Sequence, residues 1–215
     1  EFIEREHEAD ERPFFCYVPY NTPHTPASVP VDKWREWVDR TDVEDPFSRA
    51  MSALVENVDD NMGRLLAKLE ELEILDDTVF IFLTDNGPNS ARFNGGMLGR
   101  KATVHEGGVR VPLFVRWPER IQAGMVVKPN VAHIDLLPTL SRIAGIENLE
   151  GKTLPLDGMD VTPLLYGEDD FEMPERNLFV WRKPESWSIR TSRYRATETM
   201  LHDLLEDPGQ KNNLA

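Results

Sequence analysis

Residues 78–88, TVFIFLTDNGP, join an apolar run to an acid, an amide, a glycine and a proline. The run has apolar side chains on both faces, and such a strand usually lies in a parallel sheet between layers of helices. We therefore predict a strand over residues 78–84, buried on both sides. Ligands of open α/β sheets bind beyond the carboxyl ends of the strands. Asp85 and Asn86 lie where a binding site is expected.

Helical and strand patterns alternate on both sides of this run. Asp45 suits a helix N-cap, and apolar residues then recur at intervals of three and four as far as Leu72, which predicts a long amphipathic helix. The other predicted elements are strands over residues 13–20 and 111–117, a helix over 135–143, and short antiparallel strands over 178–181, 187–191 and 193–197. This order predicts an α/β layered domain over residues 1–150 and a smaller subdomain over 151–215.

Composition narrows the classes of partner. The chain has 215 residues, 40% of them hydrophobic, and a formal net charge of -14. It is long enough to bury a core, its acidity disfavours nucleic acid, and no apolar run approaches the roughly 20 residues of a membrane span. Its one cysteine, Cys16, has no partner for an internal disulfide. We expect Cys16 to be a small buried residue of the predicted strand over residues 13–20.

Carboxylates, amides and histidines mark two candidate metal sites. Asp85 and Asn86 offer the hard oxygen ligands that calcium or magnesium prefers, but calcium takes about six to eight oxygens. The alternative is that these residues only form a turn. His133 and Asp135 could also bind a metal, although we favour the interpretation that they brace the helix beginning there.

The glycine-rich stretch after the strand carries candidates for anion binding. Lys101 lies between two glycine clusters and offers a compact positive charge to an anion. His105 is either a site residue or a neutral packing residue, and Glu106 is expected to form a structural ion pair with Arg110. His24, in the proline-rich turn PHTP, suits an anion contact or general acid catalysis; the alternative is a loop histidine without a role.

Segments spread over nearly the whole chain resemble one family in the same order. They are PYNTPHTP (19–26), FLTDNGP (82–88), GRKATVHEGGVRVPLFVRWP (99–118), AHIDLLPTLSRIAGI (132–146), DGMDVTPLL (157–165), SIRTSRYR (188–195) and HDLLEDPGQKNNLA (202–215). Together they resemble the C-terminal portion of a formylglycine-dependent sulfatase of the arylsulfatase type. The resemblance implies an alkaline-phosphatase-like α/β/α sandwich, here partial and lacking its N-terminal half, followed by a small C-terminal antiparallel sheet.

The resemblance also implies roles for particular residues. Asp85 and Asn86 match two calcium ligands, while Lys101 and His24 match the residues that contact the sulfate and to which protonation of the leaving oxygen is assigned. His105 lies in the same matching segment and is a candidate for substrate binding. The implied substrate is a sulfate ester of a small molecule or a sulfated glycan. Members of the family are mostly exported or lysosomal.

The sequence departs from the family pattern at the nucleophile. No C-x-P-x-R motif is present, since the proline after Cys16 stands one place too late and no arginine follows. The early aspartate pair that binds the metal is also missing. We expect the formylglycine and the remaining calcium ligands in a missing N-terminal half, and we expect this chain alone to be inactive. It should persist only when paired with that half or with another copy.

Two alternatives remain open at this stage. The missing nucleophile suits a non-catalytic module that binds calcium or a sulfated glycan. A zinc phosphatase or phosphodiesterase of the same superfamily is the other alternative, which Asn86 disfavours because asparagine is a poor zinc ligand.

Overall fold

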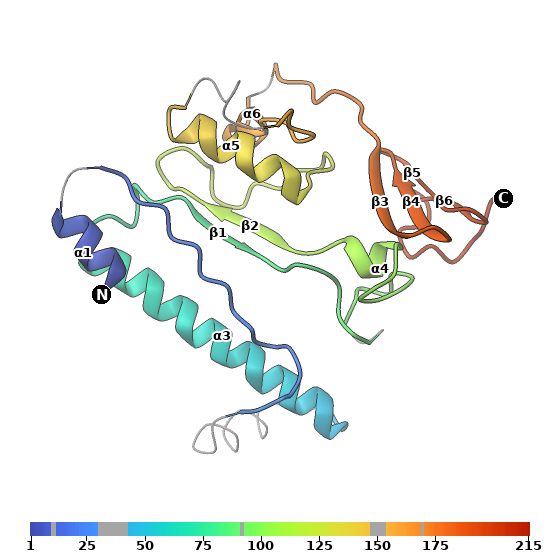
Figure 1. Cartoon of the computed structure of the whole chain (residues 1–215), viewed down its shortest axis with the longest axis horizontal. Helices are drawn as coiled ribbons and strands as arrows, with labels where there is room; N and C mark the ends of the chain where they lie inside the picture. Colours follow the sequence, from blue (N-terminus) through green and yellow to red (C-terminus); the bar gives the residue numbers. More distant parts are fainter. Residues whose placement is uncertain (10–11, 30–42, 91–92, 147–153, 169) are drawn as a thin grey trace. The chain divides into compact units, whose positions relative to one another are not determined.

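The computed structural model describes residues 1–9, 12–29, 43–90, 93–146, 154–168 and 170–215. The chain divides into two compact units, Glu1–Thr78 and Val79–Ala215, and each is described by itself (Figure 1). The division into residues 1–150 and 151–215 stays a prediction.

Helix α3 (Pro46–Glu71) confirms the long helix predicted in the first unit. The Asp45 carboxylate accepts hydrogen bonds from the backbone N–H (2.8 Å) and the hydroxyl (2.7 Å) of Ser48, which caps the first turn. One side of the helix is buried, through Ser48, Ala50, Ala53, Leu54, Val58 and Leu69. None of the described helices is both long and apolar enough to cross a bilayer.

Helix α1 (Phe2–Ala9) begins the first unit, and the strand predicted after it, over residues 13–20, is not formed. These residues belong to no strand, and Phe15 and Tyr17 are exposed. The apolar pattern alone does not make a strand, because a strand also needs a neighbouring strand for its backbone hydrogen bonds. The described residues of this unit include no such neighbour. Cys16 is exposed as well, so the prediction of its burial is wrong.

Strand β1 (Phe80–Leu83) pairs antiparallel with β2 (Leu113–Arg116) in the second unit. Both predicted strands are confirmed, but the prediction of a parallel sheet buried on both faces is wrong for this pair. The Phe82 and Phe114 rings stack at 6.4 Å, and Phe114 is 64% exposed. Strand β2 lies directly beside β1, and residues 84–112 connect the two strands in the sequence. This connection carries the candidate site.

Two short helical segments follow β2. The turn η1 (His133–Asp135) leads into helix α5 (Leu136–Ile143), which confirms the predicted helix. Gly145 has φ 73° just beyond it, a left-handed conformation that suits a helix stop. Helix α6 (Thr162–Tyr166) ends in the same way at Gly167, with φ 68°.

The fully buried Asp135 braces this region. Its carboxylate accepts hydrogen bonds from the backbone N–H of Ala132 (2.7 Å) and Met159 (3.0 Å). Arg176 donates to both of its oxygens, at 2.8 and 2.9 Å. A buried carboxylate needs such partners to offset desolvation. These contacts confirm that Asp135 braces the start of the helix, while the bracing role of His133 stays a prediction.

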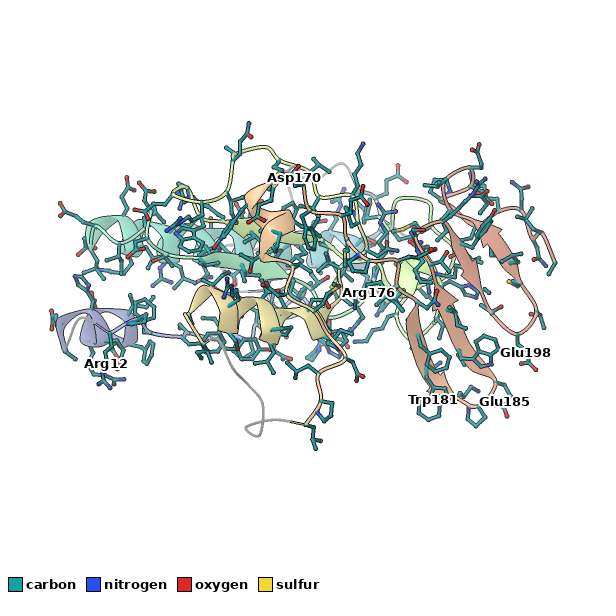
Figure 2. All side chains as sticks on the ribbon, turned by 90° about the horizontal axis from the view of Figure 1, so that it is seen from above. Arg12, Asp170, Arg176, Trp181, Glu185 and Glu198 are labelled. Atoms are coloured by element: carbon teal, nitrogen blue, oxygen red, sulfur yellow. The ribbon has the colours of Figure 1, made fainter. Side chains whose placement is uncertain are left out.

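The predicted C-terminal antiparallel sheet is confirmed. Its strands, in spatial order, are β3 (Leu178–Lys183), β4 (Ser186–Arg190), β5 (Tyr194–Ala196) and β6 (Leu201–Asp203). Strand β6 was not predicted from the sequence. Trp181 and Glu185 lie at the end of the β3–β4 hairpin (Figure 2).

The two faces of this sheet differ in chemical character. Ser188, Arg195 and His202 are buried. They share one face of the sheet, because residues that are paired across strands or lie two apart along a strand point to the same face. Phe179 and Trp181 point to the other face and are each 61% exposed. The polar face therefore packs against another part of the same unit, namely the loop between β1 and β2.

Candidate active site

Asp85 and Asn86 follow directly after β1, as predicted. The Asp85 side chain is exposed and that of Asn86 is half-buried. The Asn86 amide nitrogen donates a hydrogen bond to Oδ2 of Asp85. This bond orients the two side chains together and leaves Asp85 Oδ1 and the Asn86 amide oxygen for a ligand.

The glycine after this pair packs backbone against backbone. The Gly87 N–H donates to the carbonyl of Gly108 at 3.0 Å. A Cβ on Gly87 would lie only 1.9 Å from the carbonyl oxygen of Gly107, and a Cβ on Gly107 would lie 2.5 Å from that of Gly99. Only glycine allows such an approach. The Asp85–Asn86 segment is thereby held against the glycine-rich loop.

Lys101 lies on that loop and is half-buried. Its backbone N–H donates to the carbonyl of Pro88 at 2.7 Å, close to the Gly87–Gly108 bond. Among the described residues its ammonium group makes no ion pair. The structure therefore joins the segments that carry Asp85, Asn86 and Lys101, and it leaves the lysine charge available.

His105 precedes the short helix α4 (Glu106–Val109). Its Nδ1 is buried and has no hydrogen-bond partner among the described residues. Burial lowers the pKa of His105, and the charges of Arg195 and His202 lower it further. His105 also lines a groove together with Glu185 and Glu198. These surroundings favour a neutral packing residue, and substrate binding by His105 stays a prediction.

The lowered pKa of His105 predicts a loss of stability in acid. The unfolded chain takes up the proton near the ordinary histidine pKa of 6.5, whereas the folded chain resists it. The free energy of unfolding should therefore be highest above this pH, fall below it, and level off below the folded pKa. His105→Gln should flatten this dependence in urea unfolding between about pH 7.5 and 5. The exposed His7→Gln should not, and equal profiles for both variants would contradict the neutral His105.

His24 lies in the first unit, on an exposed turn. The Thr22–Pro23 and Thr25–Pro26 peptide bonds on either side of it are cis. Nδ1 of His24 lies 2.9 Å from the Thr25 carbonyl oxygen. Because a carbonyl only accepts, Nδ1 carries the proton and Nε2 is left for another partner. This geometry is compatible with the predicted role, in which Nε2 faces a substrate oxygen.

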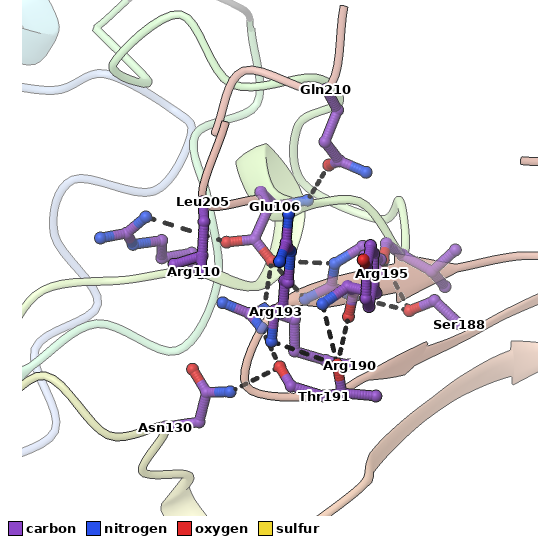
Figure 3. A network of polar contacts seen from close by, with 12 residues as sticks. Glu106, Arg110, Asn130, Ser188, Arg190, Thr191, Arg193, Arg195, Leu205 and Gln210 are labelled. Carbon is purple, nitrogen blue, oxygen red and sulfur yellow. Dashed lines mark hydrogen bonds and ion pairs between the residues drawn. The ribbon is translucent and has the colours of Figure 1, made fainter. Parts of the chain in front are cut away.

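Glu106 has stronger partners than the one predicted for it (Figure 3). Arg110 lies 4.0 Å from its carboxylate, so the predicted ion pair is present but long. Arg195 lies at 2.6 Å and Arg190 at 3.2 Å. The two closer arginines face each other across β4 and β5. No local spacing could have indicated them.

Asp85 and Asn86 give this site hard oxygen donors. Asp85 and Asn86 suit a cation such as calcium or magnesium, of which they would be two ligands. Within the described ranges, no group of three or more His, Cys, Asp and Glu residues could hold a metal ion.

Family models match both parts of the chain. A model described as "Sulfatase" matches residues 1–146, and one described as "N-sulphoglucosamine sulphohydrolase, C-terminal" matches residues 98–215. Human arylsulfatase A is 31% identical over 95% of this chain and 45% of its own length. The N-acetylgalactosamine-6-sulfatase of Canis lupus familiaris is 29% identical over 91% of this chain and 36% of its own length. The chain thus spans less than half of these curated relatives.

Solved structures agree with the family models. Ps i-CgsB in complex with k-i-k-neocarrahexaose has a TM-score of 0.85 and 26% identity, covering 99% of this chain and 48% of that one. BT4656 in complex with its substrate D-glucosamine-2-N,6-O-disulfate has a TM-score of 0.62 and 27% identity, covering 78% and 36%. The fold is therefore the alkaline-phosphatase-like α/β fold of sulfatases, together with the small antiparallel sheet. Because the first model alone covers more than half of the residues, this chain belongs to the sulfatase family, a family of metal-dependent sulfuric ester hydrolases.

Proposed function

We propose that this chain supplies cation ligands and a sulfate contact to an enzyme that hydrolyses a sulfate ester. The observation that carries the proposal is the pair of backbone hydrogen bonds, Gly87 to Gly108 and Lys101 to Pro88. They join the segment with the oxygen donors to the loop with the free lysine charge. A cation next to a fixed ammonium group is an arrangement that suits a dianionic transition state.

Each residue has a distinct role in this proposal. Asp85 and Asn86 hold a calcium ion through their oxygens. When bound, this ion supplies a positive charge and acts as a Lewis acid. Lys101 places its ammonium group on a sulfate oxygen and neutralises charge there. His24 holds the leaving oxygen with Nε2 and, when protonated at that atom, passes it a proton.

The nucleophile of the proposed reaction is a formylglycine that this chain does not contain. The sequence has neither C-x-P-x-R nor the serine form of the motif, and Cys16 stands in a different context. The nucleophile and the other calcium ligands would come from residues beyond these 215. We accordingly expect no turnover by this chain alone.

The proposed substrates are sulfate esters of small molecules or glycans. Support comes from the names of similar proteins, which include an N-acetylgalactosamine-6-sulfatase and a protein solved with a disulfated glucosamine. Loops around the site would select the sugar and the position of its sulfate. Asp85, Asn86 and Lys101 would act on the sulfate group that all such substrates share.

The proposal is tested with the complete gene product, assayed with 4-nitrophenyl sulfate and with sulfated monosaccharides. We expect hydrolysis that EDTA abolishes and calcium restores. The matching phosphate ester is the control and should be hydrolysed at least about 100-fold more slowly. Turnover of the phosphate ester with zinc would favour the phosphatase alternative. Calcium binding without any turnover would favour a non-catalytic module.

A further inference from the structure

We propose that Arg195 of the C-terminal sheet is a positioning residue for the Lys101 loop, defined as residues 98–106. Arg195 touches no substrate in this proposal. It fixes the backbone on either side of Lys101, so that the ammonium group stands where a sulfate oxygen arrives. The inference rests on the proposed function, in which Lys101 contacts the sulfate.

A single guanidinium group makes the central contacts (Figure 3). Nε and Nη2 of Arg195 donate to Oε1 of Glu106 at 2.9 and 2.6 Å. Nη1 donates to the Val104 carbonyl at 2.8 Å and to the Ser188 hydroxyl at 2.7 Å. The Ser188 hydroxyl donates to the same Val104 carbonyl at 2.8 Å. Arg195 and Glu106 are 3% and 2% exposed, so solvent does not screen this network.

The C-terminal sheet and the tail after it supply three further anchors of the loop. They are the bonds from Leu98 N–H to Gly209 O (3.1 Å), from Arg182 Nη1 to Ala102 O (2.6 Å) and from Glu106 N–H to Gln210 Oε1 (2.8 Å). The start, the middle and the end of the loop are therefore each bound to a part of the chain that follows it by about a hundred residues. The C-terminal sheet acts as a clamp on the candidate sulfate-binding loop.

The loop needs such a clamp because its backbone is strained. Ala102, directly after Lys101, has φ 66°, a left-handed conformation that is unfavourable for a residue with a Cβ. Such conformations persist only where the surroundings hold them. Arg182 binds the carbonyl of Ala102, and Arg195 binds that of Val104. Loss of these contacts would let residues 101–103 relax and would displace the lysine.

Arg195→Lys tests the clamp while keeping a positive charge at the buried position. Lysine keeps the positive charge beside Glu106, so no buried carboxylate is left without a cation. An ammonium group on a thinner stem cannot reach Glu106, Val104 and Ser188 in one planar arrangement. In the complete gene product we expect kcat/KM for a sulfate ester to fall about tenfold or more, since small displacements of a catalytic group are costly.

Arg193→Lys is the matched control. Arg193 lies two residues before Arg195 and pairs with Asp203 at 2.5 Å, but this ion pair is at the surface. None of its described contacts is with the Lys101 loop. An exposed ion pair contributes little, so kcat/KM should change less than about twofold. Equal effects of the two substitutions would overturn the proposal.

A double-mutant cycle separates positioning from general destabilisation. If Arg195 acts through Lys101, Arg195→Lys should cost less than about twofold when Lys101 is already alanine. A loss that is the same in both backgrounds would mean that Arg195 acts elsewhere, and the proposal would be wrong. Ser188→Ala removes the hydroxyl that donates to Val104 and accepts from Arg195, and it should give a smaller loss with the same dependence on Lys101. It replaces Arg195→Lys in the cycle if that variant does not fold.

Hydrogen exchange tests the clamp without any assay of activity. Amides of residues 98–106 should exchange faster in Arg195→Lys, or in Ser188→Ala, than in the parent and in Arg193→Lys. Unchanged exchange would overturn the proposal even if the enzyme is a sulfatase. Faster exchange with no hydrolysis in the parent would support the clamp and refute the proposed function, so the two failures are distinguishable.

Discussion

Replacing Lys101 with alanine should lower kcat/KM of the complete gene product for a sulfate ester by about 10²- to 10³-fold. Lys101 is half-buried and lies on a loop whose backbone is bound to the segment just after Asp85 and Asn86. Charge that grows on the sulfate during transfer would lose its fixed counter-charge, which water replaces poorly. The measurement is initial rates over a range of substrate concentrations.

Two controls test whether the effect is specific to Lys101 and to the sulfate. Lys128→Ala removes an exposed lysine of the same unit and should change kcat/KM less than about twofold. Calcium affinity should be unchanged in Lys101→Ala but greatly reduced in Asp85→Ala, because Asp85 is a proposed cation ligand and Lys101 is not. If Lys101→Ala retains full activity, or if it weakens calcium binding as much as Asp85→Ala, the assignment of Lys101 to the sulfate is wrong.

The elements with strong local signals were predicted well from the sequence. Asp45 and Pro46 mark the start of α3, and Gly145 marks the stop after α5. The short strands of the C-terminal sheet were also predicted, because alternating apolar residues and turns are local features. Strand β6, of only three residues, was missed because the apolar pattern is too short to register.

Features that depend on distant parts of the chain could not be predicted in this way. The antiparallel pairing of β1 with β2 and the exposure of Cys16 depend on which strands are neighbours, and no local pattern records that. The partners of Glu106 are the clearest case, since Arg190 and Arg195 lie 84 and 89 residues further along the chain. Arg110 was predicted because it lies four residues after Glu106, although its contact with Glu106 is the longest of the three.

The candidate site was predictable to the extent that single segments carry it. Asp85 and Asn86 end a strand and Lys101 lies on a glycine-rich loop, so each could be proposed from its own neighbourhood. Their assembly depends on glycine packing, in which the backbones of Gly87 and Gly107 touch. The sequence shows the glycines but not which pairs of them meet.

Several large apolar side chains lie on the surface of the second unit. Phe114 is 64% exposed, and Phe179 and Trp181 are each 61% exposed. Such surfaces are usually covered by further protein. Pairing with a missing N-terminal half or with a second copy remains a prediction for this chain. The molecular mass of the purified chain in solution tests it.

Gly87→Ala should strongly destabilise the second unit by adding a single methyl group. The new Cβ would lie 1.9 Å from the Gly107 carbonyl oxygen, 2.9 Å from its carbon and 3.1 Å from the Gly108 Cα. All of these atoms are backbone, so no side chain can move aside. The Gly87–Gly108 hydrogen bond must break, and we expect the free energy of unfolding to fall by about 3 kcal/mol or more in urea titration.

Two further glycine variants separate the effect of the steric clash on stability from the effect of its location on calcium binding. Gly63→Ala, in the middle of α3 with no atom within 4 Å of the new Cβ, should stabilise the protein by about 0.5–1 kcal/mol. Gly158→Ala creates an equally close clash, 1.9 Å from the carbonyl oxygen of Ile134, but beside the Asp135 brace. It should destabilise the protein as much as Gly87→Ala does. Only Gly87→Ala displaces the cation ligands, so only it should lose calcium affinity at temperatures where both variants are folded. Equal calcium affinities in the two variants would mean that the packing of Gly87 against Gly107 does not hold Asp85 and Asn86 in place.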